Sequence, residues 1–196
     1  EMVSNLSLLQ ELWVSQGHEL DDFRDYCVVI TSQGSLLDSD SVSKYRFYID
    51  DAIGGRFSVT SPVGTCILGL CFGIPAVEQF LEGAYLMDQN ATESSCDQNL
   101  SLIAAWELVW QRTVCMYPVR VCASYTSMLK LLPYYITQLT CESNGKSVDR
   151  SRQFAAYPTS PLIVPAIGTS DQHSFFQLLH QGTDIIPVEF IGIGQQ

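Results

Sequence analysis

Residues 138–146 read Gln-Leu-Thr-Cys-Glu-Ser-Asn-Gly-Lys, which is the end of a helix running into a turn. Apolar side chains recur upstream at helical spacing, at Met128, Leu129, Leu132, Tyr135, Ile136 and Leu139. The Asn-Gly pair favours a turn because both residues tolerate positive φ. The pattern predicts an amphipathic helix over 127–141, with Glu142 at its end and Gln138 one turn earlier on the same face.

Glu142 has two interpretations at this stage. A carboxylate held where a helix turns is well placed to transfer a proton to and from a bound substrate. A glutamate at the end of a helix is also commonly a solvated charge. The residues of this segment alone do not decide between the two.

Short apolar strands are predicted on both sides of this helix, in alternation with further helices. The predicted strands are 26–31, 46–49, 118–123, 162–164 and 187–192, and the predicted helices are 2–16, 62–72, one from Pro75, 97–114 and 172–181. We expect Trp106 and Trp110 to point inward, with Leu102, Ile103 and Val109. Alternation of this kind is typical of an α/β fold, with a parallel sheet covered by helices on both faces. Ligands bind such sheets at the carboxyl ends of the strands, and the turns holding Arg56, Glu142 and His173 are candidates for that edge.

Residues 53–58 read Ile-Gly-Gly-Arg-Phe-Ser. Two glycines allow a ligand to approach the backbone closely, and the arginine after them suits a phosphate or a developing oxyanion. The other interpretation is a tight turn in which Arg56 pairs with Asp50 or Asp51. Both remain open from spacing alone.

Composition excludes several classes of protein. The 196 residues hold 10 basic and 21 acidic side chains, giving a formal net charge of −11, which disfavours nucleic acid and anionic membranes as partners. We find no apolar run long enough to span a bilayer and no secretory leader, so we expect a cytoplasmic protein.

The seven cysteines form no C-x-x-C pair and lie mostly in apolar surroundings. We therefore expect reduced cysteines in the core. Asn5, Asn90 and Asn99 each begin an N-x-Ser/Thr sequon, which we interpret as chance in the absence of a leader. The three histidines show no ligand spacing, so neither a metal site nor a cofactor is expected.

Three segments together resemble the glucose-6-phosphate isomerase (phosphoglucose isomerase) family. They are Gly54–Ser58, Glu142–Lys146 and the long segment Gly168–Thr183, which contains His173. Their order and spacing fit, and the resemblance covers essentially the whole chain.

The resemblance implies a three-layer αβα fold with a parallel, Rossmann-like sheet, as in sugar isomerase (SIS) domains. Residues 1–72 would form the back half of a first SIS-type domain and residues 73–196 the front and central part of a second. The family's sugar-phosphate loop would lie upstream, closed by Glu1, with Met2 where the family usually has a threonine. A family lysine would lie beyond Gln196, so we expect this segment alone to be inactive.

The resemblance also implies residue roles in aldose–ketose interconversion through an enediolate. Glu142 would be the base and Arg56 would stabilise the enediolate. His173 would open the sugar ring and would come from the neighbouring subunit of a homodimer. The substrate-positioning groups would be Gln138, Gly55 and Glu1, whereas Lys146 is expected to be structural.

One departure from the family pattern falls beside His173. Ser170-Asp171 stands where the family usually has Asn-Gly, which removes a glycine and its freedom for positive φ. We nevertheless expect the function to be retained. A non-catalytic SIS-type module that binds sugar phosphates or mediates association is the alternative function, favoured by the sugar-phosphate loop lying outside this segment. A secreted signalling form is a more remote one, suggested only by the sequons.

Overall fold

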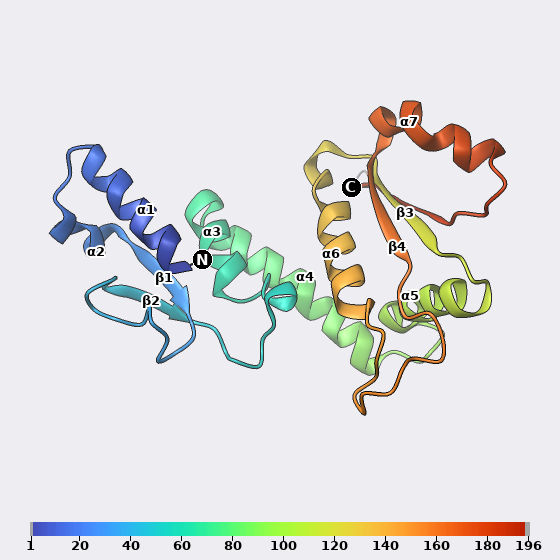
Figure 1. Cartoon of the computed structure of the whole chain (residues 1–196), viewed down its shortest axis with the longest axis horizontal. Helices are drawn as coiled ribbons and strands as arrows, with labels where there is room; N and C mark the ends of the chain where they lie inside the picture. Colours follow the sequence, from blue (N-terminus) through green and yellow to red (C-terminus); the bar gives the residue numbers. More distant parts are fainter. Residues whose placement is uncertain (1, 195–196) are drawn as a thin grey trace. The chain divides into compact units, whose positions relative to one another are not determined.

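The computed structural model describes residues 2–194 and divides the chain into two compact units, Glu1–Leu86 and Met87–Gln196 (Figure 1). Each unit is described by itself below.

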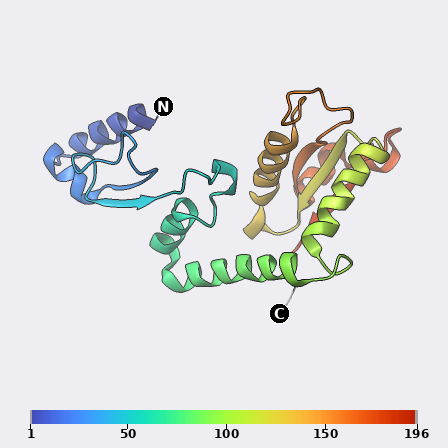
Figure 2. The same ribbon diagram turned by 90° about the horizontal axis from the view of Figure 1, so that it is seen from below.

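The first unit contains a parallel pair of strands. Its elements are α1 (Met2–Ser15), η1 (Leu20–Asp22), α2 (Phe23–Tyr26), β1 (Val28–Thr31), β2 (Tyr45–Tyr48), η2 (Gly55–Phe57), α3 (Pro62–Phe72) and the beginning of α4 (Ile74–Glu93). Val28 lies opposite Tyr45, and Thr31 lies opposite Tyr48. Figures 1 and 2 show α1 beside this pair. The Trp13 ring of α1 meets the buried Phe23 of α2 edge-on.

The ends of α3 follow the sequence as predicted. The Ser61 hydroxyl accepts a hydrogen bond from the Val63 amide, and Pro62 occupies the first turn, where its missing N–H costs nothing. Gly73 ends the helix with φ of +84°, a conformation that glycine adopts without strain. The border between the two units falls later, within α4. The predicted domain boundary at residues 72–73 stays a prediction.

The second unit is built on a three-stranded parallel sheet. Its elements are α5 (Leu100–Val109), a π-helical turn η3 (Trp110–Val114), β3 (Val119–Ser124), η4 (Ser127–Leu129), α6 (Leu132–Asn144), β4 (Leu162–Ile167), α7 (Gly168–Gln181) and β5 (Val188–Ile191). The strand order is β4-β3-β5. In the register, Val121 of β3 lies between Val164 and Val188.

Helices cover both faces of this sheet. On one face, Phe175 and Leu179 of α7 pack against a buried cluster of Val121, Ala123 and Ala166. Side chains alternate along a strand, so Arg120 and Cys122 point to the opposite face. There Arg120 lies 3.7 Å from Glu107 of α5 and 3.2 Å from Glu189 of β5. This unit therefore has the expected αβα layering.

Helix α6 runs antiparallel to β4. The Thr137 hydroxyl donates to the Ile163 carbonyl at 3.3 Å, and the Cys141 thiol lies 3.7 Å from the Pro161 carbonyl. Later residues of α6 thus meet earlier residues of β4. The carboxyl end of α6 consequently lies beside the beginning of β4 (Figure 1).

The prediction that the apolar side chains of the helix 97–114, which is α5 and η3 in the structure, point inward is wrong. Trp106 is 64% exposed and Trp110 is 50% exposed, and Leu102, Ile103 and Val109 are also exposed. The physical reason is that α5 is apolar around its whole circumference, whereas a single layer can cover only one side of a helix. No helix among residues 2–194 is both long enough and apolar enough to cross a bilayer.

The predicted helix 172–181 begins four residues earlier than expected, because α7 starts directly at Gly168. All seven cysteines are free, but Cys122 is the only one that is buried, whereas Cys71 and Cys96 are exposed. Core cysteines were expected because most have apolar neighbours in sequence. The neighbours of Cys71 show why this failed, since Leu70 and Phe72 are themselves exposed on α3.

Cys122 should resist alkylation in the native chain. Burial, with the nearby Glu189 carboxylate as a smaller cause, raises the pKa of its thiol to about 11. The thiol therefore stays protonated and unreactive at a pH of about 8. Mass spectrometry after brief treatment with iodoacetamide should find Cys71 and Cys96 modified, and Cys122 modified only after unfolding in urea. Equal rates at Cys122 and Cys96 in the native chain would contradict this burial.

Candidate active site

Glu142 lies in the last turn of α6, with its side chain exposed. The Gln138 amide donates to Glu142 Oε2 at 3.1 Å, because residues four apart share a helix face. Lys146 Nζ donates to the Glu142 carbonyl at 2.8 Å. A cation bonded to a terminal carbonyl stabilises the end of the helix, so Lys146 has a structural role here.

His173 lies in the second turn of α7, close to the carboxyl end of β4, and its side chain is exposed. The preceding residue holds the helix to the sheet, because Gln172 Nε2 donates to the Tyr125 hydroxyl at 2.7 Å. The Tyr125 ring in turn meets Phe190 of β5 edge-on, with ring centroids 5.7 Å apart. A Cβ at Gly168 would lie 2.9 Å from the Tyr125 ring, so only glycine fits at that position.

Asp171 stabilises the beginning of α7. Its Oδ2 accepts a hydrogen bond from the Ile167 amide at 2.6 Å, and a carboxylate in the first turn also suits the positive end of the helix. Neither Ser170 nor Asp171 has positive φ. The glycine that this chain lacks is therefore not needed for the backbone path seen here.

Arg56 and Gly55 belong to the first unit. They lie in the short turn η2, which is held by the Ser58 hydroxyl donating to the Gly55 carbonyl at 2.7 Å. A Cβ added to either Gly54 or Gly55 would meet no atom of the chain within 4 Å. The backbone is thus open on that side, and the Arg56 side chain beside it is half-buried. Glu1 lies outside the described residues.

Glu142 and His173 do not lie at one edge of the sheet. The end of α6 is next to the beginning of β4, whereas α7 starts at the opposite end of that strand. The six residues of β4 span about 20 Å. The expectation that Glu142 lies at the carboxyl edge is therefore wrong, because a helix that follows a strand carries the chain back to the other edge.

Tyr125 was not singled out from the sequence. It follows the predicted strand 118–123 almost directly, where side chains gather at the carboxyl edge. This position directly after a strand is the sequence signal that could have identified Tyr125 as a candidate site residue. Its hydrogen bond to Gln172 joins residues 47 apart in the sequence, which no local pattern indicates.

Comparison with known proteins gives a consistent result. Residues 2–196 match the family model described as phosphoglucose isomerase. Curated glucose-6-phosphate isomerases from Chlamydia caviae and Chlamydia trachomatis serovar D are 41% and 42% identical over 192 residues, which is 98% of this chain. The chain spans only 36% of the length of each.

Solved structures agree with the sequence comparison. The crystal structure of a glucose-6-phosphate isomerase from Chlamydia trachomatis matches 97% of this chain, with a TM-score of 0.90 and 42% identity. This chain covers 36% of that structure. A hypothetical protein from Thermus thermophilus matches 99% of the chain with a TM-score of 0.79 and 29% identity, and 46% of its own chain is covered.

Asp171→Ala should lower the free energy of unfolding by about 1 kcal/mol, because the Ile167 amide loses its carboxylate partner. Urea unfolding followed by circular dichroism measures this change. Asp184→Ala removes an exposed carboxylate just after the same helix and serves as the matched control. Equal effects of the two substitutions would show that the Asp171 hydrogen bond does not stabilise α7.

Proposed function

Because the chain belongs to the phosphoglucose isomerase family, we propose that it is the central part of a glucose-6-phosphate isomerase of glycolysis and gluconeogenesis. The reaction interconverts glucose 6-phosphate and fructose 6-phosphate. The observation that supports it best is Glu142, an exposed carboxylate oriented by Gln138 at the end of α6. The match to the family model over residues 2–196 supports the substrate class.

The proposed chemistry moves a proton between two adjacent carbons. Glu142 takes the proton from one carbon, leaving an enediolate, and returns it to the other carbon, while the hydroxyl proton passes from one oxygen to the other. The Gln138 amide bonds one carboxylate oxygen, which restricts the rotation of the Glu142 side chain. Arg56 supplies the positive charge that stabilises the enediolate oxygen. The open space beside Gly54 and Gly55 lets the substrate approach the backbone.

We propose that His173 opens the sugar ring in the site of a second copy of the chain. Within one copy, His173 and Glu142 lie at opposite ends of β4, about 20 Å apart along the strand. A general acid and base must lie within hydrogen-bond reach of the same substrate. A homodimer with paired sites satisfies this requirement, because each site takes Glu142 from one copy and His173 from the other.

Other parts of the chain would have roles outside the proton transfer. Glu1 would line the phosphate end, next to Met2. The two SIS-type domains would meet at residues 72–73. The reaction needs no metal or cofactor if Arg56 provides the charge. The seven free cysteines support a cytoplasmic location.

A non-catalytic SIS-type module that binds sugar phosphates remains the second candidate. The Ser170-Asp171 pair before His173 favours it, because the family usually has Asn-Gly there. The candidate residues Arg56, Glu142 and His173 favour the isomerase, because a binding module has no need of a base.

Glu142→Gln should lower kcat by a factor of about 100 to 10,000 in the full-length protein, because the amide keeps the shape but cannot accept the proton. Interconversion of fructose 6-phosphate and glucose 6-phosphate is the measurement. Glu82→Gln, at an exposed position of α4, is the control and should keep full activity. A fully active Glu142→Gln enzyme would rule out the proposed base.

Mixed dimers test whether the site is shared. Glu142→Gln and His173→Asn proteins should each be inactive, whereas dimers refolded from an equal mixture should recover about a quarter of the parent activity. Half of those dimers are hybrids, and one of the two sites in each hybrid keeps both residues. No recovery in hybrids whose formation is verified by mass spectrometry would show that both residues act within one chain.

A further inference from the structure

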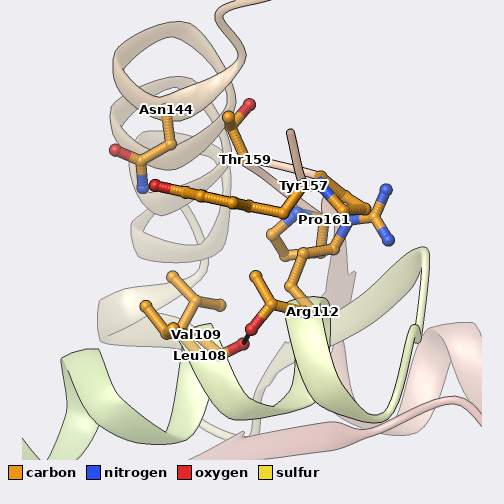
Figure 3. A pocket seen from close by; sticks show the side chains of 9 residues that line it. Leu108, Val109, Arg112, Asn144, Tyr157, Thr159 and Pro161 are labelled. Atoms are coloured by element: carbon orange, nitrogen blue, oxygen red, sulfur yellow. Dashed lines mark hydrogen bonds between the residues drawn. The ribbon is translucent and has the colours of Figure 1, made fainter. Parts of the chain in front are cut away.

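A hollow of about 590 Å³ lies in the second unit, beside the end of α6 (Figure 3). Three segments form it: α5 with its π-helical extension, the last residue of α6, and the loop 145–161. Its lining residues are Leu108, Val109, Arg112, Thr113, Asn144, Tyr157, Pro158, Thr159 and Pro161. The volume is in the range of small-molecule sites in proteins.

Arg112 is held in place by the protein but is not neutralised by it. Its Nε donates to the Ser160 carbonyl at 2.9 Å, and its side chain is half-buried. Within residues 2–194, no acidic side chain forms an ion pair with Arg112, although acidic residues outnumber basic ones by 21 to 10. With Nε bonded to the backbone, the two terminal nitrogens form the fork that binds a carboxylate.

The rest of the lining suits an apolar body. Leu108, Val109 and Pro161 present aliphatic surface, and Figure 3 shows the Tyr157 ring lying across the hollow with its hydroxyl toward Asn144. A second hollow next to it shares Arg112 and Tyr157 and adds Lys146. A second basic residue therefore lines the neighbouring hollow, in a chain whose overall charge repels anions.

This hollow is distinct from the surface that carries Glu142. Asn144 follows Glu142 by two residues, which turns the two side chains about 200° apart around a helix. Cys141, three residues before Asn144, contacts the Pro161 carbonyl on the side of the hollow. Glu142 points away from that side, together with Gln138.

We propose that this hollow binds a small organic anion, a carboxylate carried on a flat apolar ring system. The carboxylate bonds the terminal nitrogens of Arg112, and the ring lies between the aliphatic side chains of α5 and the Tyr157 ring. Arg–carboxylate pairs provide orientation as well as attraction. The proposal does not depend on the isomerase activity.

Calorimetric titration of the full-length protein with 2-naphthoate tests the proposal. Saturating fructose 6-phosphate is present throughout, so that the probe does not report on a sugar-phosphate site. We expect one binding event, and a tenfold or greater loss of affinity with uncharged 2-naphthylmethanol. Arg112→Gln should lose as much, whereas Arg150→Gln, at an exposed position of the same loop, should bind like the parent.

A second variant keeps the test valid if Arg112→Gln fails to fold. Val109→Trp leaves Arg112 intact and fills the hollow from α5, so it should abolish binding while unfolding at the parent's temperature. Absence of naphthoate binding to the parent would overturn the proposal. So would equal binding of the acid and the alcohol, or unchanged binding by a folded Val109→Trp protein.

Discussion

Parallel pairing of β3 with both of its neighbours is the constraint on which the second unit depends. In a parallel sheet, each connection must carry the chain from the end of one strand back to the edge at which that strand began. Because β4 and β5 lie on opposite sides of β3, right-handed connections place α6 and α7 on opposite faces. The same rule separates the end of α6 from the start of α7 by the length of β4. The distance between Glu142 and His173 thus follows from the topology, whatever the details of packing.

The sequence predicted most elements of this fold because their patterns are local. Pro62 and Gly73 mark helix ends through their own backbone preferences. Helix α6 also ends at Asn144, but neither Asn144 nor Gly145 has positive φ. Local sequence patterns could not predict at which edge of the sheet Glu142 lies, because strand order is a non-local property. They also misjudged Trp106, since an apolar pattern indicates that a side chain prefers burial but not that the chain provides a cover. The Tyr125–Gln172 contact could not be predicted either, because it joins segments that are 47 residues apart in the sequence.

The start of α7 shows how a local change can be accommodated. Ser170-Asp171 gives up the freedom of a glycine, yet the backbone there is helical and makes no use of that freedom. Asp171 instead bonds the Ile167 amide, and Gln172 reaches Tyr125. The adjacent residues Asp171 and Gln172 therefore attach the beginning of α7 to the end of β4 and to the residue that follows β3. His173 is the next residue, so these two contacts fix the position of its backbone, while its side chain is exposed.

The central position of β3 has a consequence during translation. Both of its partners are synthesised after it, and Arg120 precedes Glu189 on β5 by 69 residues. At ordinary elongation rates the strand waits about 3 to 14 s before its second neighbour leaves the ribosome. Val121 lacks its Val188 neighbour on β5 for that interval. The Cys122 thiol, which is buried in the folded unit, is accessible to oxidants during the same interval.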